Sequence, residues 1–357
     1  MGTLKPYILI AVVAILIGTI YFISSKSVQR GGTGEVITVT PRTSLSGPQT
    51  NREEKAKRYE LAKEITTPDG FINTDKQPIT VSELIGGKVI LVDFWTYSCI
   101  NCQRTTPYLN AWYEKYKDEG LVIIGVHTPE FEFEKDYNNV QAAVEKFGIK
   151  FPVVLDNDYS TWVVYKNQYW PRKYLIDIDG YIVYDHIGEG AYEETEKNIQ
   201  EALSERMVVL GESGVISQPL VKDTSVRNEA KSQETYFGSA RSNQQKNFLF
   251  PNDSWEITPE FAQNNSANAG IVYTYIAKDV FFVAESDTET LVEVLRDGKP
   301  LGLEAGEDIM KTVDGKSILR IKEARLYKII QGDTPNIHKL ELRIQEPGLK
   351  AFTFTFG

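Results

Sequence analysis

The pattern of apolar and polar residues predicts that strands and helices alternate in the first two thirds of the chain. Residues 88–95 form a nearly continuous apolar and β-branched run, which is typical of a strand buried on both faces of a sheet. Residues 103–117 then carry apolar side chains at helical spacing. Residues 121–126 predict a second buried strand, so that a strand, a helix and another strand follow one another.

The same alternation continues along the chain. Residues 138–147 place apolar side chains on one face of a helix, and residues 151–156 form a further short strand. Residues 174–184 predict a hairpin that turns at an Asp-Gly pair, and residues 192–206 predict a closing helix. This order indicates an α/β domain over residues 61–208, with a mixed central sheet and helices on both faces.

The pattern changes after this domain. Residues 209–231 are interrupted by glycine, serine and proline and are expected to form a linker. Residues 232–357 contain many short segments of alternating hydrophobicity, separated by turn sequences. The expected strands are residues 271–276, 280–284, 290–295, 317–321, 326–330, 339–344 and 351–356. Such a series predicts an all-β sandwich.

Two segments ahead of the α/β domain lack the pattern of a folded domain. Residues 7–23 are almost entirely apolar, and about 17 residues at ~1.5 Å each just reach the lower limit for crossing a ~30 Å hydrocarbon core. We therefore expect residues 1–24 to be a single transmembrane anchor, with a cleavable signal peptide as the alternative. Residues 25–60, rich in small polar residues and then in charged ones, are expected to form a polar linker.

The charge and length of the chain narrow the possibilities. The formal net charge is −10 at pH 7, which argues against a nucleic-acid partner because the phosphates would be repelled. A length of 357 residues with 41% hydrophobic residues allows about two or three domains with proper cores. The composition is therefore compatible with the two folded domains that the pattern predicts.

The only two cysteines, Cys99 and Cys102, lie between the first predicted strand and the helix that follows it. Cys99 is expected at the helix N-terminus, where free N–H groups and the helix dipole favour a thiolate. Two cysteines and three histidines at these spacings are too few for a zinc or haem site, so no cofactor is expected.

We interpret Cys99 as a nucleophile and Cys102 as the resolving thiol. A sulfur one helical turn away can release a mixed disulfide by forming a disulfide between Cys99 and Cys102. A pair of buried, inert thiols is the alternative interpretation. The strand-to-helix setting of the two cysteines favours the redox pair.

Several motifs around the cysteines resemble the thioredoxin superfamily. They are Val-Asp-Phe-Trp at residues 92–95, the C-x-x-C that begins at Cys99, and Pro107 in the following helix. More narrowly, residues 95–105, 125–131 and 168–171 resemble the extracytoplasmic thioredoxin-like part of DipZ-type thiol-disulfide proteins. The resemblance covers residues 65–208 strongly and the C-terminal third more loosely. It implies a thioredoxin fold in an exported domain that acts on protein disulfides or thiols.

The resemblance also implies roles for residues near the cysteines. Asp93 matches the buried acid that takes the proton from Cys102, and its place in an apolar strand predicts a raised pKa. An acid that reaches water at the end of the sheet is the alternative. Pro171 matches the cis-proline that lies against the C-x-x-C, and the backbone of Trp170 is expected to pair with an extended substrate.

Aromatic residues and a histidine flank the predicted site. Trp95 and Tyr97 are expected to shield the disulfide or contact the substrate, and packing in the core is an equally compatible interpretation. The same alternative applies to the ring of Trp170. His127 ends a predicted strand and is expected at the surface.

The leading hypothesis is a membrane-tethered, extracytoplasmic thiol-disulfide oxidoreductase that reduces or isomerises protein disulfides. Only a single span is expected, whereas DipZ-type proteins carry a multi-span membrane part, so a separate membrane electron-transfer protein is expected to supply the electrons. Residues 234–238 and Arg241 resemble the start of the carbohydrate-binding-like module attached to DipZ-type proteins, which implies a possible glycan ligand.

Two other functions stay open at this point. A thiol peroxidase is one, because Thr96 three residues before Cys99 resembles the T-x-x-C of peroxiredoxins, although Val92 stands where those proteins carry a proline. The other is a surface glycan-binding protein whose thioredoxin fold is a vestigial scaffold. The intact C-x-x-C with Asp93 and Pro171 argues against this second alternative.

Overall fold

The computed structural model describes residues 48–357 with the exception of residues 76, 221–229 and 243. All of the described residues belong to one compact unit of the chain. The expected membrane anchor at residues 1–24 and most of the expected linker at 25–60 lie outside the described residues. Among the described helices, none is long and apolar enough to span a bilayer.

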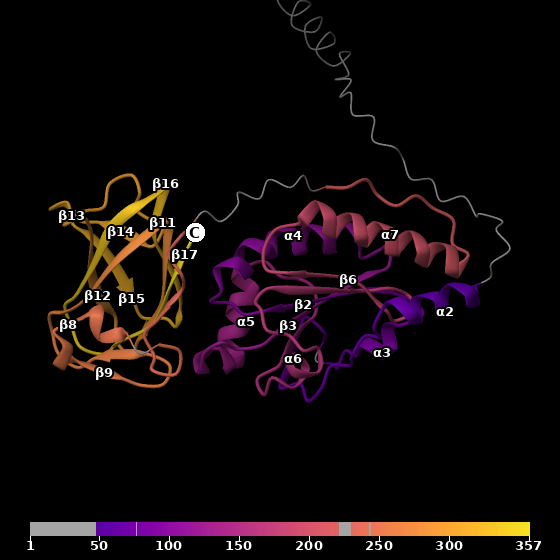
Figure 1. Ribbon diagram of the computed structural model, residues 1–357, viewed down its shortest axis with the longest axis horizontal. Coiled ribbons are helices and arrows are strands. Elements are labelled where there is room, and N and C mark those ends of the chain that lie inside the picture. The colour runs from indigo at the N-terminus through magenta and orange to yellow at the C-terminus, as the bar shows by residue number, and fades with distance from the viewer. Residues whose placement is uncertain (1–47, 76, 221–229, 243) are drawn as a thin grey trace, which may run out of the picture. The chain divides into compact units, whose positions relative to one another are not determined.

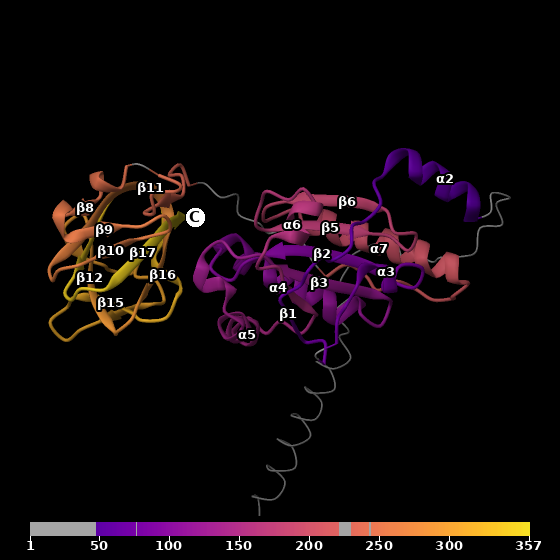
Figure 2. The same cartoon turned by 90° about the horizontal axis from the view of Figure 1, so that it is seen from below.

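The first domain is built on a six-stranded sheet with the strand order β1-β4-β3-β2-β5-β6. Its strands are β1 (Gly70–Ile72), β2 (Val89–Trp95), β3 (Leu121–His127), β4 (Val153–Leu155), β5 (Arg172–Ile176) and β6 (Ile182–Ile187). β2, β3 and β4 run parallel to one another. β1 is antiparallel to β4, β5 is antiparallel to β2, and β6 is antiparallel to β5. Figure 2 shows β2 and β3 beside β5 and β6. The predicted mixed central sheet is confirmed.

Helices cover both faces of this sheet. They are α3 (Val81–Leu84), α4 (Ile100–Tyr116), η1 (Glu132–Lys135), α5 (Tyr137–Lys146), α6 (Ser160–Val164) and α7 (Tyr192–Leu210). In Figure 1, α4 and α7 lie on one side of the sheet and α3 and α6 on the other. Successive side chains of a strand point to opposite faces. β2 therefore contributes Leu91 to the core beside α4 and α7, and Ile90 and Val92 to the core beside α3 and α6.

Helix α2 (Pro48–Arg58) occupies the end of the segment that was expected to be a polar linker. Its Lys55 is almost buried and forms ion pairs with Asp177 at 2.5 Å and Asp179 at 3.0 Å. A third ion pair joins Lys55 to Glu205 of α7 at 2.7 Å. Ion pairs rather than apolar contacts hold α2 on the domain, so its polar composition predicted a linker instead of a helix.

The segment between the two domains is also partly packed. Ile216, within the expected linker at residues 209–231, is buried in the core that contains α7. The backbone N–H of Leu220 donates to the carboxylate of Glu196 at 2.8 Å. Residues 221–229 lie outside the described residues. The described part of this segment therefore belongs to the first domain.

The second domain is an 11-stranded antiparallel sheet with the main order β14-β15-β12-β16-β11-β17-β10-β9. β13, β7 and β8 pair with β12, β17 and β11. Its strands are β7 (Thr235–Tyr236), β8 (Leu249–Phe250), β9 (Trp255–Ile257), β10 (Ala262–Asn264), β11 (Ala269–Ser286), β12 (Thr290–Arg296), β13 (Lys299–Pro300), β14 (Ile309–Lys311), β15 (Ser317–Ile321), β16 (Arg325–Ile344) and β17 (Leu349–Phe356), with 3-10 turns η2 (Gln245–Asn247) and η3 (Asn252–Ser254). The predicted all-β class is confirmed.

Two strands are longer than the sequence pattern indicated. β11 joins the predicted segments 271–276 and 280–284, and β16 joins the predicted segments 326–330 and 339–344. The two strands pair with each other, with a register shift between residues 277 and 279 of β11. The middle of β16 is mostly exposed, so its polar side chains looked like a break between two strands.

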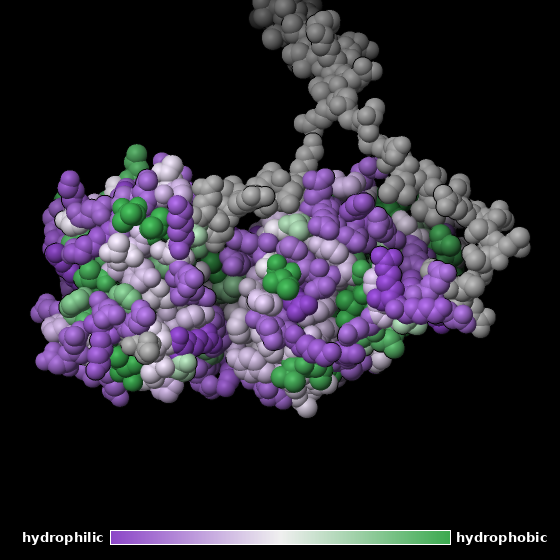
Figure 3. All heavy atoms as spheres, viewed as in Figure 1, coloured by the Kyte–Doolittle hydropathy of each residue, from purple (hydrophilic) through white to green (hydrophobic). Residues whose placement is uncertain are grey.

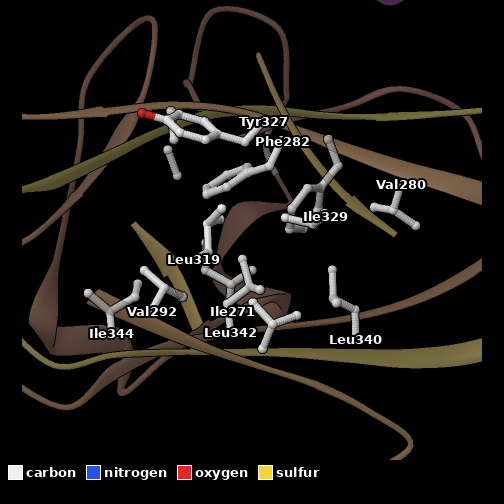
Figure 4. Close-up of a cluster of buried hydrophobic side chains, with 14 of the residues drawn as sticks. Ile271, Val280, Phe282, Val292, Leu319, Tyr327, Ile329, Leu340, Leu342 and Ile344 are labelled. Atoms are coloured by element: carbon white, nitrogen blue, oxygen red, sulfur yellow. The ribbon is translucent and has the colours of Figure 1, made fainter. Parts of the chain in front are cut away.

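The core of the second domain lies between strands on its two sides. In Figure 4, Phe282 and Ile329 lie across the cluster from Leu319, Ile271 and Leu342, and the long strands β11 and β16 contribute residues to both sides. Packing of one layer of strands on another is the arrangement that a sandwich requires. The face of the molecule in Figure 3 is mainly hydrophilic, with hydrophobic residues in small separate groups. Most buried apolar residues of this domain belong to its own core, whereas Phe281, Val283, Leu326 and Phe352 form a second cluster with Ile100 and Phe131 of the first domain.

Candidate active site

Cys99 and Cys102 lie where β2 is followed by α4. Cys99 is the N-cap residue of α4, and its Sγ accepts a hydrogen bond from the backbone N–H of Cys102 at 3.4 Å. Cys99 is half-buried, whereas Cys102 is only 2% exposed, and both are free thiols. A helix N-terminus stabilises negative charge on a nearby sulfur. The arrangement leaves one thiol partly accessible at a helix N-terminus, with the other buried behind it.

Trp170 and Pro171 lie against the accessible thiol. The peptide bond between them is cis, and the Cys99 Sγ is 3.8 Å from the backbone oxygen of Trp170, to which it donates. The indole Nε1 of Trp170 donates to the carbonyl of Thr128 at 3.0 Å, and its ring lies 4.3 Å from that of Trp162. These contacts fix the Trp170 backbone next to the sulfur of Cys99.

Asp93 is buried in the middle of β2, with 2% of its surface exposed. Its Oδ1 has no hydrogen-bond partner. Burial raises the pKa of Asp93 to about 7, and the charge of Lys173 acts in the opposite direction. Burial and the neighbouring Cys99 raise the pKa of Cys102 well above its ordinary value. Two buried acids of raised pKa, one carboxyl and one thiol, are therefore close enough to interact electrostatically.

Sequence reasoning missed Lys173, which pairs with Asp93 across β2 and β5. The residue is completely buried, and its Nζ donates to the carbonyl of Gly188 at 3.2 Å. Burial lowers the pKa of Lys173, and Asp93 and Cys102 partly oppose this shift. The predicted hairpin began at residue 174 and so left Lys173 outside it, whereas β5 begins at Arg172 and places Lys173 on the same face as Leu175.

Sequence reasoning also missed Glu134, whose carboxylate is completely buried beneath the loop that leads to Cys99. It accepts hydrogen bonds from the Ser98 hydroxyl at 2.7 Å and the Ser98 N–H at 3.2 Å. Its other oxygen accepts from the N–H groups of Glu130 at 2.5 Å and Phe131 at 3.1 Å. Burial raises the pKa of Glu134 to about 6. An acid usually lies at the surface, so the Phe-Glu-Phe-Glu run that contains Glu134 did not indicate that its side chain is buried.

His127 is completely buried, so the expectation of a surface histidine was wrong. Its Nε2 lies 3.4 Å from the Thr96 hydroxyl, and its ring lies between those of Trp95 at 5.1 Å and Tyr97 at 5.8 Å. Burial lowers its pKa to about 3, which keeps the imidazole neutral. The histidine ends a buried strand and packs with its aromatic neighbours.

Trp95 and Tyr97 are 3% and 5% exposed and belong to the core on the α4 side of the sheet. The Tyr97 hydroxyl donates to the carbonyl of Ala324 at 3.2 Å. Side chains buried to this extent have little surface left for a substrate. The structure therefore favours packing over direct substrate contact for these two aromatic residues.

A groove of ≈ 290 Å³ opens at Cys99. Its first-domain lining is Cys99, Ile100, Asn101, Glu130, Gln168, Tyr169 and Trp170, and its second-domain lining is Glu234, Tyr236, Arg241 and Thr355. The carboxylate of Glu130 pairs with the guanidinium of Arg241 and accepts from the hydroxyl of Tyr236 at 2.8 Å. Residues of the β domain therefore form part of the wall beside the accessible thiol.

Two family models match the chain. Residues 60–218 match the model described as Redoxin, and residues 222–357 match the model described as Thioredoxin like C-terminal domain. The first match includes the whole sheet that carries Cys99 and Cys102, and the second includes all of the strands β7 to β17. The two models therefore divide the chain near the segment between the two observed domains.

The chain is also similar to curated proteins, some of which are named thiol-disulfide oxidoreductases. Protein DipZ of Mycobacterium tuberculosis is 36% identical over 321 residues, which is 82% of this chain and 43% of that protein. The thiol-disulfide oxidoreductase YkuV of Bacillus subtilis is 28% identical over 142 residues, 40% of this chain and 93% of that protein. The chain thus spans less than half the length of the DipZ proteins that it matches.

A solved structure of a putative thiol:disulfide interchange protein DsbE from Chlorobium tepidum aligns with 41% of this chain and 96% of its own, with 24% identity and a TM-score of 0.36. The chain is thus similar in sequence to thiol-disulfide oxidoreductases, and its first domain matches the Redoxin family model.

Proposed function

We propose that this oxidoreductase reduces or isomerises disulfides of other proteins through a dithiol formed by Cys99 and Cys102. The observation that carries the proposal is the position of the Cys99 sulfur. It lies at the N-terminus of α4, beside the Trp170 backbone, in a groove open to a substrate. Cys102 is buried directly behind it, and the backbone N–H of Cys102 donates to the Cys99 sulfur.

The reaction has two displacement steps. The Cys99 thiolate attacks one sulfur of a substrate disulfide, so that a mixed disulfide forms and the other substrate sulfur leaves as a thiolate. Cys102 then gives its proton to Asp93, and its sulfur attacks Cys99. The substrate leaves as a dithiol that has gained two electrons, and a disulfide between Cys99 and Cys102 remains on the enzyme.

Asp93 supports the second step because it is a buried base of suitable strength. A group with a pKa near the working pH accepts and releases protons efficiently, and burial raises the pKa of Asp93 to about 7. The backbone of Trp170 and the cis-proline Pro171 are proposed to bind an extended segment of the substrate beside Cys99. The Trp170 carbonyl that faces the sulfur supports this placement.

The test is to trap the mixed disulfide. Cys102→Ala keeps the attacking thiol and removes the resolving one. The reduced variant should therefore accumulate covalent adducts with disulfide-containing proteins such as insulin, which mass spectrometry detects. Cys99→Ala is the matched control and should form no adduct. A folded Cys102→Ala variant that yields no adduct while the wild-type protein reduces insulin would contradict the assignment of Cys99.

We further propose that the protein acts outside the cytoplasm and is anchored by the apolar residues 7–23. The 36% identity to DipZ proteins supports this location. Because Cys99 and Cys102 are the only cysteines, a membrane-impermeant maleimide reports directly on the site. The full chain should stay with membranes after alkaline extraction and react with the reagent in intact spheroplasts. Extraction into the soluble fraction, or labelling only after lysis, would contradict this proposal.

The oxidised protein needs a source of electrons, and we propose a separate membrane electron-transfer protein. This chain has no cysteine in residues 7–23 that could carry reducing equivalents across the bilayer. The full chain in sealed vesicles should therefore stay oxidised when a reductant is enclosed on the other side. Re-reduction of the isolated chain under these conditions would remove the need for a partner. Glycan binding by residues 232–357 stays a prediction from the resemblance.

A further inference from the structure

The second domain closes one side of the active site. Ile100, which stands between the two cysteines, is 3% exposed. It packs in a cluster with four side chains of the second domain, Phe281, Val283, Leu326 and Phe352. In the next turn of α4, Arg104 pairs with Asp279 of the second domain at 3.5 Å, and its guanidinium lies over the ring of Phe281 at 5.4 Å. A substrate therefore reaches Cys99 through the groove that the two domains share.

The described lining of this groove contains one cation, Arg241. Its guanidinium pairs with the carboxylate of Glu130 and donates to the backbone carbonyl of Glu130 at 3.2 Å. It also lies over the rings of Tyr236 at 4.6 Å and Phe131 at 5.5 Å. Contacts with a carboxylate, a carbonyl and two ring faces leave Arg241 poorly placed to bind an anionic substrate.

Glu234 lies in the same lining and forms no ion pair with any residue in the described part of the chain. Its oxygens accept from the hydroxyls of Tyr236 at 2.7 Å and Thr355 at 3.0 Å. The Tyr236 hydroxyl is also 2.8 Å from Glu130, and a hydroxyl has a single proton to donate. Burial and the charge of Glu130 raise the pKa of Glu234, and Arg241 only partly opposes this shift. Two carboxylates therefore compete for one hydroxyl proton beside a guanidinium that is already paired.

An adjoining cavity continues the acidic lining. It has a volume of ≈ 240 Å³ and shares Glu130, Tyr236 and Arg241 with the groove at Cys99. Its own acid is Glu260, whose carboxylate accepts from the backbone N–H of Glu132 at 3.2 Å. The described lining of the two cavities thus contains three carboxylates and one guanidinium. A site with this excess of negative charge favours a cationic partner over a neutral or anionic one.

We propose that the groove at Cys99 binds a lysine or arginine side chain of the substrate, and that Glu234 is the residue that selects it. The inference rests on the proposed dithiol function and narrows its substrates to disulfides that have a basic residue close by in an extended segment. The N–H groups of this side chain donate charge-assisted hydrogen bonds to Glu130 and Glu234, the two carboxylates that share the Tyr236 hydroxyl. An acidic residue at the same place adds a further negative charge and is repelled.

The test compares peptides that differ in one residue. Each peptide carries a single disulfide, with lysine, glutamine or glutamate next to one of its cysteines, and is mixed with the reduced full chain at low salt and mildly alkaline pH. The second-order rate constant for reduction of the lysine peptide should exceed that of the glutamine peptide about 3- to 10-fold, and the glutamate peptide should react slowest. The preference should shrink as salt is added, because salt screens the charges.

Matched controls separate the groove from the overall charge of the chain, which is −10 at pH 7. A peptide of the same composition, with its lysine far from the disulfide, should lose the advantage. Glu234→Gln keeps the shape of the side chain and should bring the lysine and glutamine rate constants close together. Glu201→Gln, which removes an acid of α7 that is 61% exposed, should leave their ratio unchanged.

Three results would overturn the inference. They are equal rate constants for the three peptides with the wild-type protein, a distant lysine as effective as a near one, and a ratio that survives Glu234→Gln. A preference for the glutamate peptide would instead assign the groove to an anionic segment and contradict the choice of a cation. A wild-type protein that reduces none of the peptides would overturn the proposed function itself.

Discussion

The carboxylate of Glu134 accepts hydrogen bonds from both the hydroxyl and the backbone N–H of Ser98, the residue immediately before Cys99. The small hydroxyl of Ser98 lets a completely buried acid from η1 approach the loop. The position of the accessible thiol therefore depends on a polar contact with a distant part of the chain.

Removal of that contact should cost stability. Glu134→Ala leaves the Ser98 hydroxyl and the N–H groups of Glu130 and Phe131 without their acceptor, and unsatisfied buried groups of this kind predict a loss of about 3 kcal/mol. Urea denaturation measures the change. Glu132→Ala, which removes a neighbouring acid that is 72% exposed, is the control and should change little. Equal stabilities of the two variants would show that the Ser98 contact contributes nothing.

The pH dependence of stability should report the ionisation of Glu134. Burial raises its pKa from 4.5 to about 6, so the folded protein holds the proton more tightly than the unfolded chain. Protonated Glu134 contributes about 2 kcal/mol to the stability of the folded protein. This contribution is complete below about pH 4.5 and is lost as the pH rises to about 6. Glu134→Gln cannot ionise. The stability of the wild type relative to this variant should therefore fall between pH 4.5 and 6.5, and parallel curves would contradict the prediction.

The elements around the site could be predicted from sequence because a local pattern of residues indicates each of them. A run of apolar residues with a single acid predicts β2, and two cysteines ahead of a helical pattern predict the start of α4. The burial of Asp93 follows from the same run. Every residue of β2 is indeed buried.

The missed features depend on contacts between residues far apart in the chain. Glu134 and Lys173 are charged, and single-sequence reasoning places such residues at the surface. Only the register of β2 with β5 shows that Lys173 faces Asp93. His127 was misplaced for a related reason, since it packs against aromatic rings at the end of β2 and in the loop before α4. Helix α2 was missed because Lys55 finds its three carboxylates only after folding.

The ion pairs of Lys55 lead to a prediction for α2. Lys55→Met should destabilise the first domain by about 3 kcal/mol, since it leaves the buried Asp177 without its cation and Asp179 with Arg52 alone. Chemical denaturation gives the free energy, and protease cleavage within residues 48–58 reports release of the helix. Lys57→Met, on the exposed side of the same helix, is the matched control. A variant as stable and as protease-resistant as that control would show that α2 is held by other contacts.

The last prediction concerns the direction of electron flow. Reference couples of this fold extend from about −270 mV for thioredoxin to about −120 mV for DsbA, whose reduced form is stabilised. Here the Cys99 sulfur accepts the N–H of Cys102, and the residues between the cysteines, Ile100 and Asn101, carry neither charge nor imidazole. Ile100 is also buried among aromatic side chains. The helix N-terminus is thus the main local stabiliser of the thiolate.

A stabiliser of this moderate strength predicts a potential near the thioredoxin end of the range, which makes the protein a reductase or isomerase. Equilibration with glutathione redox buffers measures the potential. Asn101→His places an imidazole between the cysteines, where it can donate to the thiolate, and should raise the potential by tens of mV, about 1.4 kcal/mol for each 30 mV. A wild-type potential above about −150 mV would make the protein a disulfide donor. An unchanged potential in Asn101→His would show that groups other than those between the cysteines set the thiolate's stability.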